Sequence, residues 1–352
     1  MPNMSEFIAA MPKAELHVHI EGTIEADLLL AIADRNGIHL PYKTADDILS
    51  GQREGKTDAK QNLDSFIECL DVCRGVLRTQ QDYEDITYEF LKKCHGENII
   101  YSEIMFDPQQ GLRQGMKLEA LLEGLFSGAR AANQAFGIST QWIMNFQRDY
   151  PVEDACNILL RAQPYKDDIV GIGLDNPEIH NFPEKFAPLF QHAKEQGYRL
   201  TSHCDVHQPN SIGHIRDCIE ILGVERIDHG LNAIEDETLI AQLVDGNIAL
   251  TGCPNRYAYQ PENASSNDLG MMIRLLEQGV LVSINSDDPA QFGSGWLTQT
   301  MIEAQKNGNL SLETMIKFMR CSFQSAWLPE DRKTFYLQQL ERFSESGDSI
   351  PI

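Results

Sequence analysis

Histidine and carboxylate side chains recur at the ends of apolar, strand-like runs along the whole chain. His17 and His19 stand in ELHVHIEG, His203 in LTSHCDV, His229 in RIDHG and Asp287 in LVSINSDDP. Imidazole nitrogens and a carboxylate oxygen are the ligands that zinc and similar divalent ions take in proteins. A catalytic metal site keeps one position open for water beside such ligands. The pattern therefore indicates a metal-dependent hydrolase.

The local spacing of these residues suits one ion. His17 and His19 are two positions apart, so on a strand both imidazoles point to the same face. Asp287 and Asp288 are adjacent carboxylates that repel each other unless each has a partner; a metal on the first and a substrate hydrogen bond on the second would supply these. His229 is expected to take the proton of a metal-bound water or to stabilise the hydroxide. The alternatives are hydrogen-bonded core histidines, a helix cap at SDDP and a structural loop histidine.

Eight short apolar or β-branched runs that end in polar residues are expected to form strands, with helical patterns between most of them. This alternation predicts an α/β fold with a parallel sheet, closed most simply as a (β/α)8 TIM barrel. Active sites of such barrels lie at the carboxyl ends of the strands, where the polar residues named above cluster. The predicted strands are 14–19, 99–106, 139–146, 169–175, 199–205, 226–229, 247–253 and 281–287.

The domain organisation follows from the spacing of these strands. The chain has 352 residues and no Pro/Ser-rich linker, which predicts a single barrel domain over 1–352. The first two predicted strands are separated by an unusually long segment, about 21–98, which contains helical patterns and a polar stretch. We expect extra helices there, inserted over the barrel mouth as a lid.

Bulk composition narrows the class of partner. The net charge of −23 argues against nucleic acid or an anionic membrane held by general electrostatics, but it is compatible with a small purine. The chain begins without a basic, apolar leader pattern and holds no apolar run of roughly 18 residues, so we expect a cytoplasmic protein. Eight cysteines without a CxxC pair predict reduced, mostly buried thiols. Cys204 adjoins His203 and could ligate metal, but a buried small hydrophobe is the expected role. A homo-oligomer is left open.

Six segments in order resemble the adenosine/adenine deaminase family: ELHVHIEGT, EIMFDPQ, GIGLDNPE, RIDHG, TGCP and SINSDDPAQFG. The resemblance runs from about residue 11 to residue 330. It implies a (β/α)8 barrel with one divalent metal, for which zinc is the expected ion. It also implies attack of metal-bound hydroxide on an adenine-like purine, adenine or adenosine, with release of the 6-amino group as ammonia.

The resemblance also implies roles for individual residues. His229 would orient or deprotonate the metal-bound water, and Asp288 would hydrogen-bond the purine ring. The implied metal ligands are His17, His19, His203 and Asp287.

Two segments are more similar to the adenine deaminases, which act on the free base. After the HxH motif the chain reads Ile20-Glu21-Gly22, where adenosine-type members usually carry an aspartate. Glu21 would then occupy space that a ribose otherwise uses. The segment GLDNPE points the same way, and its Asn176 is a further predicted substrate contact.

One motif departs from the family pattern of His-Ala-Gly-Glu. The chain reads His203-Cys204-Asp205-Val206, so Val206 stands where a glutamate normally protonates a ring nitrogen. Loss of a general acid typically costs about 10²–10⁴-fold in rate. Three interpretations stay open. Asp205, which faces the same side of a strand as His203, takes over as the acid; or the substrate is a modified or N6-substituted purine; or the chain binds metal and purine with weak catalysis.

Overall fold

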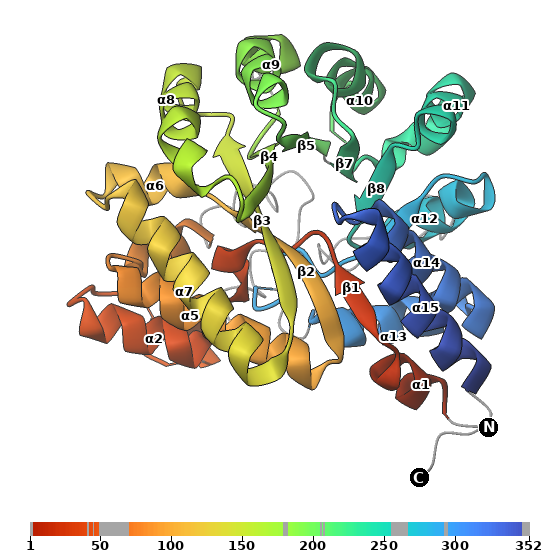
Figure 1. The fold of residues 1–352 in the computed structure, drawn as a ribbon, viewed down its shortest axis with the longest axis horizontal. Helices are drawn as coiled ribbons and strands as arrows, with labels where there is room; N and C mark the ends of the chain where they lie inside the picture. Colours follow the sequence, from red (N-terminus) through yellow and green to blue (C-terminus); the bar gives the residue numbers. More distant parts are fainter. Residues whose placement is uncertain are drawn as a thin grey trace.

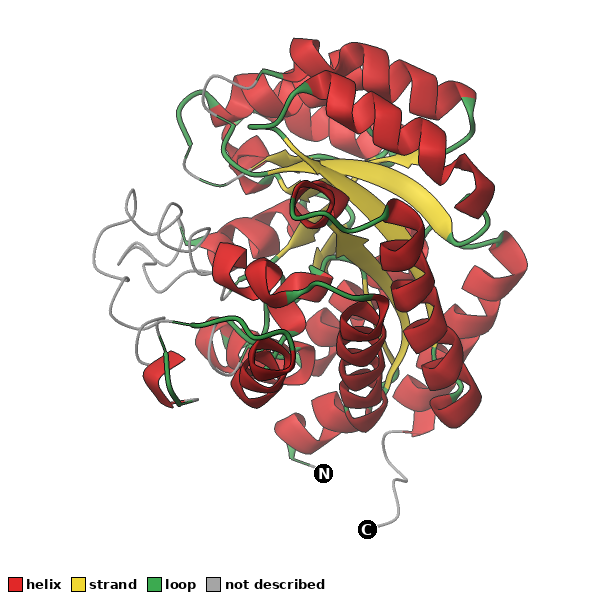
Figure 2. Cartoon of the chain, turned by 90° about the vertical axis from the view of Figure 1, so that its left-hand side faces the viewer, coloured by secondary structure: helices red, strands yellow, loops and turns green. Residues whose placement is uncertain are grey.

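A ring of parallel strands forms the centre of the molecule, with helices packed around its outside (Figures 1 and 2). The computed structural model describes residues 3–40, 42–44, 46–48, 70–178, 182–204, 206, 208–254, 267–291 and 295–346. The predicted (β/α)8 barrel is confirmed. Within the described residues, no helix combines the length and the apolar character that a membrane crossing requires.

The strands form two parallel sheets that together make up the barrel wall. The first sheet has the order β1 (Lys13–Glu15), β2 (Ile99–Phe106), β3 (Ser139–Gln147), β4 (Ile169–Asp175) and β5 (Arg199–Leu200). The second has the order β6 (His203–Cys204), β7 (Arg226–His229), β8 (Ala249–Gly252) and β9 (Val282–Ile284). Because neighbours in each sheet are parallel and consecutive in the chain, the connections between them are crossovers, most of which carry helices.

The fifth predicted strand, 199–205, is divided into β5 and β6. Thr201 and Ser202 lie between the two parts, yet both still bond to the neighbouring strands: Thr201 N donates to Ile172 O at 3.0 Å, and Asp228 N donates to Ser202 O at 3.0 Å. The run therefore keeps its place between β4 and β7, and the barrel retains eight strand positions.

The barrel closes between the first and the last strand. Leu16 N donates to Asn285 Oδ1 at 2.9 Å, and isolated parallel bridges pair Val18 with Asp287 and His19 with Met105. The first and last strands are shorter than the predicted 14–19 and 281–287, because the chain beyond β1 and β9 leaves regular pairing. These irregular ends carry three of the four predicted metal ligands, His17, His19 and Asp287.

Helices cover the outside of the ring (Figure 1), and one of them, α14 (Leu312–Ser325), packs against both β1 and β9. Gly124 and Gly128 allow two of them, α5 and α7, to cross closely, since a Cβ atom there would lie 2.4 Å from Gln80 O and 2.6 Å from Glu84 O. The α-helices are α1 (Met4–Ala10), α2 (Ala26–Arg35), α5 (Gln80–Gly96), α6 (Pro108–Arg113), α7 (Leu118–Phe136), α8 (Val152–Ala162), α9 (Ala187–Glu195), α10 (Ser211–Asp217), α11 (Glu237–Gly246), α12 (Asp268–Glu277), α13 (Leu297–Gly308), α14 (Leu312–Ser325) and α15 (Glu330–Ser346). Short helical turns are η1 (Ile20–Thr23), η2 (Gln163–Tyr165), η3 (Pro183–Phe186), the π-helical η4 (Cys218–Leu222) and η5 (Leu231–Glu235).

The predicted lid, 21–98, is described only in part. Its helix α5 packs against α7 on the outside of the barrel. Residues 70–76 are helical and bring Arg74 to the end of β2, where its guanidinium pairs with Asp107. Residues 49–69 lie outside the described residues, so the lid stays a prediction.

A buried ion pair links two barrel strands. Arg226 Nη1 on β7 donates to Glu103 Oε2 on β2 at 2.5 Å, and both side chains are almost wholly inaccessible. Tyr101 Oη and Trp327 N donate to the other carboxylate oxygen, and the Arg226 guanidinium lies 3.8 Å from the Trp327 ring centre. Such a pair is costly to break because the remaining charge has no water around it.

Glu103→Ala is therefore expected to lower the free energy of unfolding by about 3–5 kcal/mol, since it leaves the Arg226 charge buried without its partner. Denaturant unfolding at constant pH measures the change. The matched control is Glu119→Ala, which removes an exposed partner of Arg161 and should change the same quantity by less than about 1 kcal/mol. Equal, small effects in the two variants would contradict the importance of the buried pair.

Candidate active site

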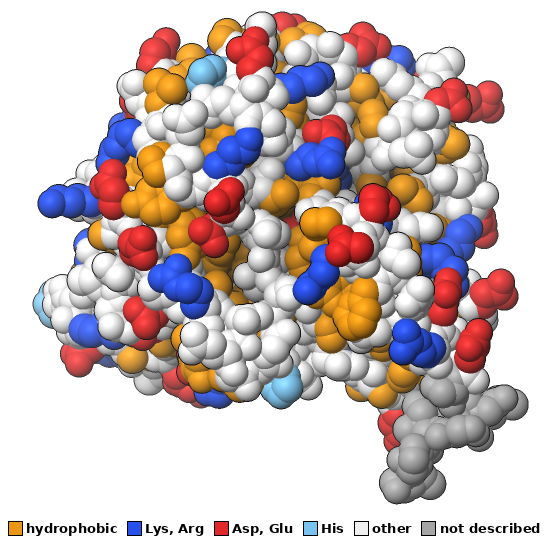
Figure 3. Space-filling view, viewed as in Figure 1, with side chains coloured by type: hydrophobic (Ala, Val, Ile, Leu, Met, Phe, Trp, Pro, Cys, Tyr) orange, Lys and Arg blue, Asp and Glu red, His pale blue; other side chains and the backbone are white. Residues whose placement is uncertain are grey.

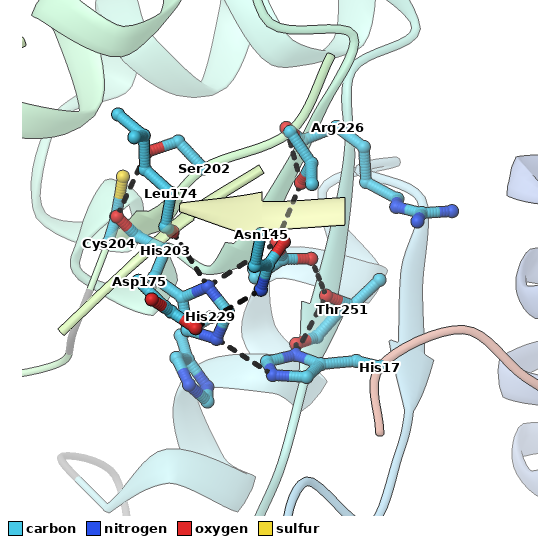
Figure 4. A network of polar contacts seen from close by, with 12 residues as sticks. His17, Asn145, Leu174, Asp175, Ser202, His203, Cys204, Arg226, His229 and Thr251 are labelled. Carbon is cyan, nitrogen blue, oxygen red and sulfur yellow. Dashed lines mark hydrogen bonds and ion pairs between the residues drawn. The ribbon is translucent and has the colours of Figure 1, made fainter. Parts of the chain in front are cut away.

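Four of the predicted ligands converge inside the barrel at the carboxyl ends of the strands. His203 Nε2 lies 3.1 Å from His17 Nε2 and 3.1 Å from His19 Nε2. Asp287 Oδ1 lies 3.3 Å from His17 Nε2 and 3.6 Å from His19 Nε2. All four residues are buried, and Figure 4 shows the His17 and His203 rings meeting edge to edge beside His229.

The outer nitrogens of two of these rings are already engaged. His17 Nδ1 lies 3.2 Å from Thr251 O and 3.1 Å from Thr251 Oγ1, and His203 Nδ1 lies 3.0 Å from Leu174 O. A carbonyl oxygen only accepts hydrogen bonds, so this network assigns N–H to Nδ1 and leaves a lone pair on Nε2 in both rings. Lone pairs of neighbouring imidazoles that point at one another repel unless a cation lies between them. Three Nε2 atoms and a carboxylate oxygen therefore fit a divalent metal ion.

Two residues of this cluster have a strained backbone. His229 has φ 64° and Asp287 has φ 66°, whereas the other non-glycine residues with positive φ in the described part of the chain are all asparagine. Non-glycine residues adopt this left-handed region uncommonly, and asparagine, aspartate and histidine do so more often than the others. Asp287 is held there by its own backbone, because its N–H donates to His17 O at 3.1 Å and its carbonyl accepts from His19 N at 3.0 Å. Strain of this kind concentrates at functional sites.

Asp228 supports the cluster from behind, a role that its place in RIDHG did not reveal. Its two carboxylate oxygens accept from Thr201 Oγ1 at 2.7 Å and from Thr251 Oγ1 at 2.8 Å. Thr251 in turn contacts the His17 ring, and Asp228 Oδ2 lies 3.6 Å from His203 Nδ1. Asp228 thereby holds two of the imidazoles in place without belonging to the group of four.

A second set of carboxylates lies beside His19. Asp107 and Asp175 place oxygens close enough to His19 to form a group with it, and Glu21 Oε1 accepts from Asp107 N at 3.1 Å. Burial and the Asp107 charge raise the pKa of Glu21 to about 8, and burial and Asp107 also raise the pKa of Asp175 well above its usual range. Arg74 pairs with Asp107 and is the only cation brought into this set by the described part of the inserted segment. The position of Arg74 beside Asp107 could not be predicted from the local sequence, because it depends on tertiary packing.

Asp288 faces the same space and is 2 % exposed. Its Oδ1 has no hydrogen-bond partner among the described residues. Burial and the neighbouring Asp287 raise its pKa well above the usual range. Gly22 makes room for it, since a Cβ atom at that position would lie 1.9 Å from Asp288 Oδ1. A buried acidic group without a partner is suited to a hydrogen bond with a ligand.

The remaining predicted residues differ in where they lie. His229 is buried, with its Nε2 3.7 Å from Asp287 Oδ2. Asn176 is half-buried, and its side-chain amide donates to Asp149 Oδ1 at 2.9 Å, so its contact with a substrate stays a prediction. Asp205 lies outside the described residues. Val206 is 4 % exposed and packs in the apolar core.

Comparisons with known proteins agree with this geometry. The model of the family described as adenosine deaminase matches residues 12–342. An adenine deaminase of Acinetobacter baylyi is 36% identical over 342 residues, which cover 97% of this chain and 99% of the relative. A protein described as an uncharacterized deaminase of Schizosaccharomyces pombe is 39% identical over 355 residues, which cover 99% of this chain and 100% of that relative. The crystal structure of adenine deaminase from Arthrobacter aurescens is similar with a TM-score of 0.87 at 32% identity, covering 96% of this chain and 100% of that one.

Fold and site together define a metal-dependent hydrolase that acts on carbon–nitrogen bonds, as the sequence predicted. The chain belongs to the adenosine deaminase family and, within it, to the adenine deaminase type. Its class of reaction is the hydrolytic removal of an amine from a purine.

Asp287→Ala is expected to lower the bound metal by one equivalent per chain and to abolish turnover, because the only carboxylate ligand of the group of four is removed. Elemental analysis of the purified protein measures the metal, with circular dichroism to check the fold. The control Asp236→Ala removes an exposed cap of α11 and should leave the metal content unchanged. Full metal content and full turnover in Asp287→Ala would overturn the ligand assignment.

Proposed function

We propose that this protein is a zinc-dependent deaminase of free adenine, which it converts with water into hypoxanthine and ammonia. The observation that carries the proposal is the convergence of His17, His19, His203 and Asp287 on one point at the carboxyl ends of the barrel strands. A zinc ion bound by these residues would supply a Lewis acid that makes water nucleophilic near neutral pH. Relatives of Acinetobacter baylyi and Psychrobacter cryohalolentis that match 97% and 96% of this chain are named adenine deaminases, which supports adenine as the substrate.

His229 and Asp288 are proposed to act directly on the reactants. His229 lies beside His17 and Asp287, where its imidazole can hold the attacking water or accept its proton. Asp288 is buried with an oxygen that has no hydrogen-bond partner among the described residues, and it can bind a purine ring nitrogen. Burial and the neighbouring Asp287 raise its pKa, which favours the protonated form relative to an exposed aspartate.

Glu21 supports the free base over the nucleoside. It is 1 % exposed, and its carboxyl group lies against the start of α6 through the bond from Asp107 N. Asp107 is itself paired with Arg74, so a residue of the inserted segment holds Asp107, and through it Glu21, in place. A ribose would have to displace this buried, interconnected set. We therefore propose that Glu21 closes the site to a sugar.

A second candidate function rests on Val206. This side chain is buried in the apolar core and has no proton to donate, so the usual general acid is missing at its position. Asp205 is proposed to replace it. If Asp205 does not serve, the favoured substrate becomes an N6-substituted purine whose amine leaves without a proton from that position.

The charge of the protein supports a small-molecule substrate as its partner. Lys and Arg side chains are spread among Asp and Glu over the face drawn in Figure 3 and do not gather in one basic patch there. With a net charge of −23, a phosphate backbone would be repelled overall.

The decisive experiment compares ammonia release from adenine, adenosine and N6-methyladenine by the zinc-loaded protein, with methylamine release measured for the last. We expect turnover of adenine and little of adenosine. Asp205→Asn should lower kcat/KM for adenine by about 10²–10⁴-fold, because an amide cannot replace a general acid.

The control for that variant is Asp245→Asn, an exposed change on α11 that should leave kcat/KM unaltered. Turnover of N6-methyladenine alone would support the second candidate function. Turnover of adenine that is unaffected in Asp205→Asn would exclude Asp205 as the acid.

A further inference from the structure

A second group of metal-binding side chains lies directly behind His203. Successive side chains of a strand point to opposite faces, so Cys204 points away from the barrel interior that His203 faces (Figure 4). There it meets Cys218 of the π-helical η4 and His214 of α10. The candidate ligand atoms of Cys204, His214 and Cys218 all lie within 4.8 Å of one another, and all three residues are buried.

The spacing of these atoms suits a tetrahedral ion. The two sulfur atoms lie 3.7 Å apart. Two thiolates bound to one zinc at the usual Zn–S length of about 2.3 Å are separated by about 3.8 Å in tetrahedral geometry. The distance is far longer than the roughly 2.05 Å of a disulfide bond.

The third member of the group is the imidazole of His214. His214 is 6 % exposed, and its Nε2 has no hydrogen-bond partner among the described residues. Glu178 follows β4 in the chain and is also buried, and its Oε2 lies 3.5 Å from this nitrogen. Glu178 therefore lies beside His214 but outside the group of three ligand atoms.

We propose that Cys204, His214 and Cys218 bind a second zinc ion. Two sulfurs with an imidazole select zinc over magnesium or calcium. Binding requires both thiols to lose their protons to solvent, and the site is filled as the chain folds. Because the three ligands are buried on the outer side of β6, away from the group of four, the role of the ion is structural.

This ion would fix the strand that carries a ligand of the first site. Cys204 adjoins His203, whereas His214 and Cys218 belong to the helical segment packed outside β6. The second zinc would thus tie α10 and η4 to β6 and hold His203 in place. The inference does not rest on the proposed reaction, and its test needs no substrate.

The first measurement is made on the full-length wild-type protein, purified under reducing conditions and loaded with zinc. We expect two zinc ions per chain by elemental analysis. X-ray absorption at the zinc edge should show sulfur neighbours at about 2.3 Å. One zinc per chain with only nitrogen and oxygen neighbours would overturn the proposal. So would a disulfide between Cys204 and Cys218, found by peptide mass mapping of the same sample.

Variants locate the second ion. Cys218→Ala should retain one zinc per chain, and Asp287→Ala should also retain one, but at the other site. Replacement of zinc by cobalt separates them: a thiolate-to-cobalt charge-transfer band in the near ultraviolet should persist in Asp287→Ala and vanish in Cys218→Ala.

Cys94→Ala is the matched control, since it removes another buried thiol, on α5, and should leave both metal content and spectrum unchanged. A charge-transfer band that survives in Cys218→Ala, or two zinc ions in that variant, would overturn the proposal. If Cys218→Ala does not fold, the absorption result on the wild-type protein decides alone. Loss of activity with two zinc ions retained would count against the proposed function and not against this site.

Discussion

The structure depends on the closure of the barrel between the segment after β1 and the segment after β9. There the backbones of His17, His19 and Asp287 bond to each other, and the same three residues supply side chains to the site. The closure brings Asp287 Oδ1 to 3.3 Å from His17 Nε2 and 3.6 Å from His19 Nε2, and His203 Nε2 on β6 lies 3.1 Å from both imidazole nitrogens. Three lone pairs that face one another in this way are stabilised by a cation. Asp287 accepts a left-handed backbone in this position. The same residues therefore close the barrel and form most of the metal site.

Several surrounding residues hold the barrel closure and the site beside it in place. Asp228 and Thr251 brace the His17 ring from the neighbouring strands, and Gly22 keeps clear the space that Asp288 occupies. On the other side, Arg74 reaches in from the inserted segment to pair with Asp107, beside Glu21. The Cys204, His214 and Cys218 group lies one layer further out and, with its proposed ion, would hold His203 in place. Residues that contact the proposed metal are thus held by residues that never touch it.

The sequence predicted the barrel and the group of four because both depend on local signals. Apolar runs mark the strands, and polar residues at their ends meet wherever parallel strands form a ring. Other features arise from tertiary packing and have no such signal. The break between β5 and β6, the arrival of Arg74 and the bracing by Asp228 are of this kind. Cys204 is buried, as predicted, but its sulfur contacts Cys218, which is 14 positions away and could not be paired with it from spacing alone. Asn176 was chosen from its motif, and its amide contacts Asp149.

The central claim is that water, activated at the group of four, replaces an amine on a purine. Incubation of the zinc-loaded protein with adenine in ¹⁸O-labelled water tests it most directly. The account predicts hypoxanthine that carries one ¹⁸O atom at C6, formed in equal amount with ammonia, and no such product with Asp287→Ala. Unchanged adenine after prolonged incubation with fully metal-loaded, folded protein would contradict it.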